Sequence, residues 1–544
     1  MTRREAWLSA GLVFLVALAA RSLFASTLHF PTPEDTAYYV GVARNVLEGR
    51  GLVSDAIWSF QTPPLAFPRP AFEVWLPLPS LIALPAMAIL GATFDAAKVP
   101  AVLIGALVPV LAWRLAADVA VERAFPVGRA RTLALGTGLT AAVYLPLVLF
   151  GALPDSTMPF ALLTLAATLL MTRILAHPPA GSAVRDGRLL GLGLVLGLAA
   201  LTRNEVVWLA LTWVGLAWWT GPHGRRLALI GVPAVVALVV FLPWVVRDWA
   251  VFGNPLPGQA LANALSITGF DIFAWKDPPT LSRYLAIGPA RLIQLRAEGL
   301  WHDLANVLVA PGFPVALIGL VALPWSGRAR SLRPLVIVSV TTFLVTGLLF
   351  PVSTTWGTFL HAAGAIQVLL VISALVGLDA LIAQVGVRRG WTRPVAWLGP
   401  VLTIGSALLF SGLILTAYGK QSVDVARRYE LLGERMAAIG HPLDATAGPV
   451  VTDFPIWLAE ARRIPTLGLP AESPADVVDL AHAFPGTRYL VIDDQDDHGG
   501  WPAVLATDAP GAACFHELDL GAPPSDENDA RILGRTRVFE IGCP

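Results

Sequence analysis

Long apolar runs fill most of the first 420 residues of the chain. About eleven of them are compatible with helices that cross a bilayer. They lie near residues 7–26, 99–118, 132–150, 158–176, 188–202, 205–220, 227–247, 304–325, 334–351, 359–385 and 396–418. The composition agrees, since 55% of the residues are hydrophobic and only 14% are charged. We therefore expect a polytopic α-helical membrane protein with about eleven transmembrane helices.

The charge balance and the motif content disfavour several function classes. The formal net charge is +0, so no overall field attracts a nucleic acid, and we expect no nucleic-acid partner. The sequence has no P-loop, HExxH, GxSxG or CxxC pattern, which argues against an ATP-driven pump, a zinc protease and a serine hydrolase. The first run resembles a signal peptide, but its length and the spans that follow favour a retained first helix.

The topology depends on one further apolar segment, Leu76–Gly91, which is short and contains three prolines. If it does not cross and the N-terminus is cytoplasmic, arginine clusters such as Arg123, Arg129 and Arg131 fall on the cytoplasmic side. The short outer connections then carry no Lys or Arg. If the segment crossed, every later connection would move to the opposite side of the membrane, and the arginine clusters would violate the positive-inside rule. We therefore expect an interfacial or re-entrant segment.

Three long segments then lie on the extracytoplasmic side of the cell membrane. They are the first outer loop with interfacial helices (27–98), a second outer loop (248–303) and the chain from 420 to 544. The second loop ends in an amphipathic stretch that we expect to lie on the membrane. Residues 1–419 are predicted to form the membrane domain and 420–544 a small soluble α/β domain. Cys514 and Cys543 there are either a disulfide or two free thiols.

Two acidic positions stand at the predicted outer mouth of the bundle. In HFPTPEDTAYY, Thr32 is the expected helix cap, Pro33 the first helical residue, and Glu34 and Asp35 lie in the first turn. In GALPDST, Asp155 lies in a tight connection between two spans, where a carboxylate can simply cap the next helix. The topology brings both acids to one face, which favours a functional site.

Basic residues near the same face have two interpretations. Arg203 has Glu205 as a local partner, and Arg247 precedes Asp248. Such arginines snorkel or form local ion pairs, but a guanidinium group also binds phosphate oxygens with two parallel hydrogen bonds. His361 is a lone histidine at the outer end of a helix, where packing or a hydrogen bond is favoured over metal binding.

A series of short motifs resembles a known family. DTAYYVGVARNVLEGRGL, a proline-bearing apolar segment ending in LG, the acid of PDST, LAALTRNE and PWVVRDWAVFGNPLP follow one another within residues 1–260. Their order resembles the GT-C fold glycosyltransferases, in particular family 39 and the dolichyl-phosphate-mannose-protein mannosyltransferase group in bacteria, with the lipid A aminoarabinose transferases as relatives. The resemblance implies a hexosyl- or pentosyltransferase. It would transfer sugar, with inversion, from a polyprenyl-phosphate donor to a protein, lipid or glycan acceptor.

The resemblance implies a role for Asp35, and the placement of the other residues predicts theirs. Asp35 would be the catalytic base, although the family's Asp-Glu pair is not kept because Thr36 follows Asp35. Asp155 would be a supporting acid or metal ligand. The substrate-binding residues expected are Glu34, Tyr38, Tyr39, Arg69, Arg203, Glu205, Arg247 and His361. The sequence establishes no cofactor, and a divalent cation is left open.

The alternative function is a lipid-linked-sugar flippase or another membrane transporter without transferase chemistry. That class predicts polar residues at mid-membrane and often a repeat between the two halves of the chain. In this sequence the acids lie at helix mouths and no repeat is visible. The transferase is therefore the favoured hypothesis.

Overall fold

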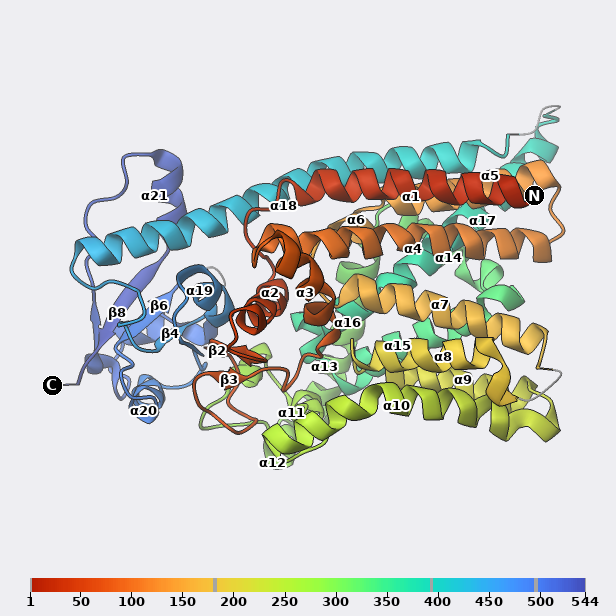
Figure 1. The fold of residues 1–544 in the computed structure, drawn as a ribbon. Helices are drawn as coiled ribbons and strands as arrows, with labels where there is room; N and C mark the ends of the chain where they lie inside the picture. Colours follow the sequence, from red (N-terminus) through yellow and green to blue (C-terminus); the bar gives the residue numbers. More distant parts are fainter. Residues whose placement is uncertain (1, 180–182, 392–394, 494–497, 544) are drawn as a thin grey trace.

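The computed structural model describes residues 2–179, 183–391, 395–493 and 498–543. Its helices form an elongated bundle (Figure 1). The N-terminus lies at one end of the bundle, and a small α/β domain lies beyond the opposite end. We call that opposite end the outer end, and we call residues 450–543 the C-terminal domain.

Within the described residues, seven helices are long and apolar enough to cross a membrane, counting the 3-10 turns that precede α10 and α15. They are α1 (Arg3–Ala25), α4 (Phe94–Glu122), α7 (Thr157–Ala176), α10 (Arg226–Phe252), α15 (Arg333–Leu349), α17 (Gly364–Arg388) and α18 (Leu398–Ala438). The other predicted runs fall on shorter helices. These are α5 (Val127–Val143), α6 (Leu145–Leu149), α8 (Gly187–Ala200), α9 (Val206–Thr220) and α14 (Val315–Ser326). The chain is a multi-pass helical membrane protein.

Short helices gather at the outer end of the bundle. They are α2 (Glu34–Leu47), α3 (Leu78–Leu90), α11 (Ala260–Leu265), α12 (Leu281–Ala286), α13 (Gly288–Trp301) with its π-helical continuation η4 (His302–Val309), and α16 (Thr358–Ala362). Helix α3 has 13 residues, or about 20 Å, which is less than the bilayer core of about 30 Å. This length agrees with an interfacial segment.

The start of α2 differs from the prediction. Thr32 is not its cap, because Pro33 keeps an extended backbone (φ −72°, ψ −176°) and itself occupies the capping position, with no side-chain hydrogen bond. The helix therefore begins one residue later than expected, at Glu34. Gly49 adopts φ +79° just after the helix, as a helix end requires.

The C-terminal domain is built on a six-stranded mixed sheet in the order β2-β5-β4-β6-β8-β7. Its strands are β4 (Val450–Thr452), β5 (Thr466–Gly468), β6 (Tyr489–Ile492), β7 (Phe515–Glu517) and β8 (Arg537–Ile541). Its helices are α19 (Pro455–Arg462), α20 (Pro474–Ala483) and α21 (Glu527–Leu533). The first four strands of that order run parallel, whereas β8 pairs antiparallel with β6 and β7. Cys514 and Cys543 form a disulfide.

The sixth strand of this sheet comes from the first outer loop. β2 (Ala56–Ile57) runs parallel to β5 with Ala56 opposite Thr466, while β1 (Val53–Ser54) and β3 (Arg69–Pro70) pair with each other. One hydrophobic cluster contains residues of the first loop, of α10, of α18 and of the C-terminal domain. The first outer loop and the C-terminal domain therefore share a core.

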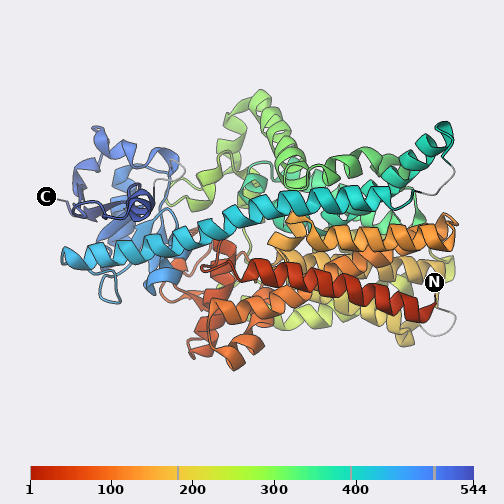
Figure 2. The ribbon, with the colours of Figure 1, turned by 90° about the horizontal axis from the view of Figure 1, so that it is seen from above.

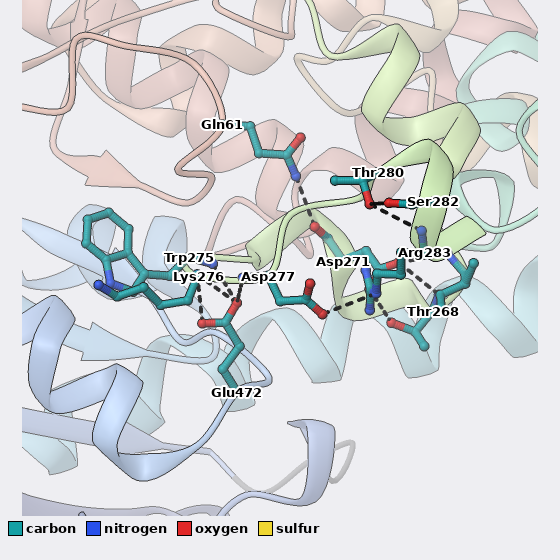
Figure 3. Close-up of polar contacts among 11 residues, drawn as sticks. Gln61, Thr268, Asp271, Trp275, Lys276, Asp277, Thr280, Ser282, Arg283 and Glu472 are labelled. Carbon is teal, nitrogen blue, oxygen red and sulfur yellow. Dashed lines mark hydrogen bonds and ion pairs between the residues drawn. The ribbon is translucent and has the colours of Figure 1, made fainter. Parts of the chain in front are cut away.

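Two further features join the membrane bundle to the C-terminal domain. Helix α18 has 41 residues and continues from the bundle to the C-terminal domain (Figure 2), so residue 420 lies inside a helix. The second outer loop is held by Glu472, whose carboxylate accepts backbone N–H groups of Trp275, Lys276 and Asp277 at 2.9–3.0 Å (Figure 3).

A buried arginine of α1 shapes the chain before Asp155. The Arg21 guanidinium donates to the backbone oxygens of Ala142 at 3.0 Å and Leu147 at 2.8 Å. These carbonyls flank the break between α5 and α6, where backbone groups lose their helical partners. Gly151 lies against the same guanidinium, since a Cβ at this position would be 2.4 Å from Arg21 Nε. Arg21 thus fixes the connection that carries Asp155.

Candidate active site

Three elements far apart in the sequence bring Asp35, Asp155 and His361 together. Asp35 lies in the first turn of α2, Asp155 just before α7, and His361 in the short helix α16. His361 Nε2 is 3.2 Å from Asp35 Oδ2, and His361 Nδ1 is 3.8 Å from Asp155 Oδ2. One imidazole therefore lies between two carboxylates at the outer end of the bundle.

Asp155 has a capping role and also belongs to this group. Its Oδ1 accepts the backbone N–H of Thr157 at 2.8 Å, which caps the start of α7. Its Oδ2 is buried without a hydrogen bond. Burial raises the pKa of Asp155 to about 7, with a further contribution from the Asp35 charge, while hydrogen bonds from Thr157 act in the opposite direction. The capping interpretation made from the sequence is confirmed by this hydrogen bond, and a functional role for Asp155 stays a prediction.

His361 is held from two sides. Its Nδ1 is 2.8 Å from Thr157 Oγ1, while its Nε2 faces Asp35. Burial lowers the pKa of His361, and the Arg203 charge lowers it further, while Asp35 raises it. The Thr157 hydroxyl can donate to Nδ1, which leaves Nε2 to face the Asp35 carboxylate. His361 therefore places a polar ring nitrogen 3.2 Å from the Asp35 carboxylate.

Arg203 completes the group. It forms a two-bond ion pair with Glu205, at 2.7 Å and 3.1 Å, and it also donates to Ser156 Oγ at 2.9 Å and to the Thr358 carbonyl at 3.1 Å. These bonds tie the turns before α9, α7 and α16 to one another. Its positive charge interacts electrostatically with the Tyr39 hydroxyl, as do the negative charges of Asp35 and Asp155. We call Asp35, Asp155, Arg203, Glu205 and His361 the mouth cluster.

Access distinguishes the two acids of the mouth cluster. The Asp35 side chain is 22% exposed, whereas that of Asp155 is 0% exposed. An incoming hydroxyl can therefore reach Asp35 but not Asp155 in this conformation. Asp35 fits the role of a proton acceptor, and Asp155 fits a supporting role.

A shallow apolar pocket reaches Asp155 from between α3, α4 and α7. Asp155 is the only charged residue in its lining, which otherwise consists of Pro79, Ile82, Ala83, Ala97, Pro100, Ala101, Ile104, Leu153, Pro154, Met158 and Pro159. Leu81 of α3 and Leu103 of α4 are exposed, at 39% and 46%. Apolar side chains exposed on adjacent helices of a membrane protein face lipid, so the pocket suits the chain of an amphiphile.

Other residues predicted for the site lie in a second group, which we call the loop cluster and define as Tyr38, Arg69, Glu73, Trp244 and Arg247. Arg69 donates to the Thr62 carbonyl at 2.5 Å and lies 3.7 Å from Glu73. Tyr38 accepts the Phe72 N–H at 2.6 Å. Arg247 pairs with Asp248 at 2.9 Å and lies over the Trp244 ring at 4.8 Å. None of these contacts joins the loop cluster to Asp35.

Glu34 also points away from the mouth cluster. Its Oε1 accepts the N–H of Ile456 at 3.0 Å, at the start of α19 in the C-terminal domain. Burial raises the pKa of Glu34 to about 8, while the backbone hydrogen bonds from Ile456 and Trp457 act in the opposite direction. The side chain of Glu34 therefore contacts α19, whereas that of Asp35 contacts His361.

Sequence reasoning missed the polar residues that hold the mouth cluster together. Ser156 and Thr157 follow Asp155 directly, and their hydroxyls bind Arg203 and His361. The PDST motif contained this signal, because a hydroxyl one or two residues after a functional acid lies on the same turn. The buried Glu73 gave no local signal.

The cation left open from the sequence has no ready three-ligand site. Across the described ranges, no three His, Cys, Asp or Glu side chains come close enough together to hold a metal ion. Asp35, Asp155 and His361 would be the nearest donors.

Similarity to known proteins is confined to structure. No family model and no curated protein matches the sequence. The fold is similar to ArnT from Cupriavidus metallidurans bound to undecaprenyl phosphate, with 15% identity, 98% of each chain covered and a TM-score of 0.56. It is also similar to the oligosaccharyltransferase AglB from Archaeoglobus fulgidus in complex with an inhibitory peptide and a dolichol-phosphate. That match has 13% identity, covers 95% of this chain and 73% of the other, and has a TM-score of 0.53.

These likenesses confirm the GT-C fold that the sequence motifs predicted. The match to ArnT spans nearly the full length of both chains, so the membrane helices and the C-terminal domain are included in it. The more specific resemblance to family 39 stays a prediction.

Proposed function

We propose that the chain is an inverting glycosyltransferase that moves a sugar from a polyprenyl-phosphate donor to a hydroxyl group of a protein, lipid or glycan. The observation that carries the proposal is the mouth cluster: an accessible carboxylate, Asp35, is oriented by a buried histidine next to an apolar pocket. A lipid-linked sugar needs both features, because its sugar reacts in water while its tail stays in the membrane. The undecaprenyl phosphate and the dolichol-phosphate named for the two similar structures support a lipid donor.

Asp35 would act as the general base. The acceptor oxygen forms a bond to the anomeric carbon as its proton passes to the Asp35 carboxylate, and the bond between that carbon and the phosphate oxygen breaks. The electron pair of the broken bond leaves with the polyprenyl phosphate. His361 keeps one Asp35 oxygen engaged at 3.2 Å, so the other oxygen is free to face the acceptor.

Positive charge near the donor phosphate would come from Arg203. Its guanidinium lies in the mouth cluster and acts electrostatically on Asp35 and Tyr39. A preorganised cation offsets the charge that develops on a leaving phosphate. Glu205 holds this guanidinium in place through two hydrogen bonds. Arg247 and Arg69 stay predicted phosphate ligands of the loop cluster.

The reaction is proposed for the extracytoplasmic face of the cell membrane. The arginine clusters Arg123–Arg131 and Arg225–Arg226 lie at the ends of helices remote from the C-terminal domain, and the positive-inside rule places that end in the cytoplasm. The mouth cluster and the C-terminal domain would then face outward. Such a location suits acceptors of the cell envelope.

The test uses the full chain in proteoliposomes with a radiolabelled polyprenyl-phosphate sugar and membrane extract as the source of acceptor. Transfer predicts that the label leaves the lipid fraction and appears in an acceptor fraction. A transporter would move the intact labelled lipid between leaflets without consuming it. Movement without consumption would therefore establish the flippase alternative instead.

A further inference from the structure

Glu34 connects the helix of the candidate base to the C-terminal domain. Its carboxylate accepts backbone N–H groups of Ile456 and Trp457, of which the first lies at 3.0 Å. These amides are at the start of α19, where N–H groups have no partner within the helix. A buried acceptor there satisfies them and fixes the first turn of α2 against α19.

The geometry of α2 couples this contact to Asp35. Successive residues of an α-helix project about 100° apart, so Glu34 and Asp35 point to different neighbours. One reaches α19, and the other reaches His361 at 3.2 Å. A rotation of α2 about its axis would disturb both contacts together.

Two more contacts hold the same segment. Arg44, ten residues after Glu34, forms a two-bond ion pair with Glu460 of α19 at 2.5 Å and 2.6 Å. Both side chains are less than 10% exposed. Beyond the helix, the Asp55 carbonyl accepts the Thr466 N–H at 2.9 Å, where β2 joins the sheet. The start of α2, its third turn and the strand after it are all bound to the C-terminal domain.

We propose that the C-terminal domain positions Asp35 for proton transfer by holding α2, and that Glu34 is a positioning residue and does not bind substrate. The inference rests on the proposed function, in which Asp35 is the base. The exact position of the Asp35 carboxylate matters, since a misplacement of about 1 Å can lower a rate about 100-fold. The C-terminal domain is thus a structural part of the active site.

The test compares Glu34→Ala with Glu34→Gln in the full-length protein. The Gln carboxamide oxygen still accepts the two N–H groups of α19, whereas Ala cannot. We expect kcat to fall about 10- to 100-fold in Glu34→Ala and to stay within about threefold in Glu34→Gln, with KM for the lipid donor nearly unchanged in both. Arg291→Gln is the matched control, because it removes an exposed ion pair inside α13, where Arg291 donates to Glu298 at 2.8 Å.

A second measurement follows α2 directly. Hydrogen–deuterium exchange of the full chain in detergent should show faster exchange of amides in residues 34–47 for Glu34→Ala, but not for Glu34→Gln or Arg291→Gln. This readout does not depend on transferase activity. It also separates a local loosening of α2 from global unfolding, in which the whole C-terminal domain would exchange faster.

Two results would overturn the inference. If Glu34→Ala keeps the wild-type kcat and exchange, the contact with α19 does not position Asp35. If Glu34→Gln loses as much activity as Glu34→Ala while α2 stays protected, the carboxylate itself acts on the substrate. Failure of the proposed function would look different, because the wild-type chain would then transfer no sugar in the same assay.

Discussion

Two groups of charged side chains lie at the outer end of the bundle, and they differ in how they meet their surroundings. In the mouth cluster, Asp35 is 22% exposed and an apolar pocket reaches Asp155. In the loop cluster, Arg69 and Glu73 are 0% and 1% exposed, and Arg69 donates to backbone carbonyls of its own loop. Buried charge alone therefore does not mark a reaction site. Access and an adjacent pocket distinguish the mouth cluster.

The loop cluster has a structural explanation. Arg69 gathers the carbonyls of Thr62 and Pro64, and Trp244 packs edge-on against Phe72 at 5.6 Å. A guanidinium group that satisfies carbonyls of an irregular segment fixes its path. We expect this cluster to shape the first outer loop, with smaller effects on the chemistry.

The largest expected effect is that of Asp35→Asn. Loss of the base should lower the transfer rate by about 10²- to 10⁴-fold, while Asn keeps the side-chain volume and a hydrogen-bond acceptor. Transfer of labelled sugar and binding of the donor should be measured on the same preparation. Unchanged transfer by this variant would remove the mouth cluster from the chemistry and leave the comparison without its basis.

The second prediction compares Arg203 of the mouth cluster with Arg247 of the loop cluster. Arg203→Gln should lower kcat by about 10²- to 10³-fold, because a preorganised cation facing the leaving phosphate is lost. Arg247→Gln should cost about tenfold or less, since Arg247 lies in the loop cluster, where it contacts Asp248 and the Trp244 ring and not Asp35. Steady-state kinetics with the lipid donor check both. A larger loss at Arg247 would assign the phosphate to the loop cluster.

His361→Gln should have a smaller effect. The polar contact of Nε2 with the Asp35 carboxylate at 3.2 Å should contribute about 1 kcal/mol, which corresponds to about a fivefold change in rate. Gln can restore the contact with Asp35 only in part. Thr157→Val is the matched control, because it removes the hydroxyl at Nδ1 and leaves Nε2 in place. Equal losses in both variants would show that the orientation of the ring, and not its bond to Asp35, is what matters.

The sequence predicted the helical architecture because the physics of a membrane span is local. A run such as 7–26 is apolar over its whole length, and it became α1 (Arg3–Ala25). The positions of Asp35 and Asp155 at helix ends were also predictable, because the order of spans assigns each connection to one side of the membrane. The motif order then indicated the fold, which the structural likenesses confirm.

The assembly of the site could not be read in the same way. His361 was a lone histidine, and Asp155 lies more than 200 residues before it. Only the packing of α16 against α7 brings them together. Strand β2 has two residues, which is too short for a pattern, and its partner β5 lies about 400 residues later. The difference between Glu34 and Asp35 likewise depends on α19, which no local pattern connects to α2.

The smallest expected effect concerns stability, and it compares a buried acid from each cluster. Burial raises the pKa of Asp155 to about 7 from an ordinary value of 3.8, and it also raises the pKa of Glu73. Between the unfolded and folded pKa values the folded chain holds a proton that the unfolded chain has released. Each group therefore stabilises the fold at low pH, and this contribution is lost as the pH rises towards the folded pKa, for Asp155 between about pH 4 and 7.

Asp155→Asn and Glu73→Gln cannot ionise, so the Tm of each variant in detergent should fall less steeply with pH than that of the wild type, by about 1–4 °C over this window. The two variants should then diverge in activity, because only Asp155 lies against His361 and the pocket. Thermal unfolding from pH 4 to 8 and transfer assays at pH 7 check both parts. If Glu73→Gln lost as much transfer activity as Asp155→Asn, the loop cluster would take part in the reaction and the two clusters would have to be treated as one site.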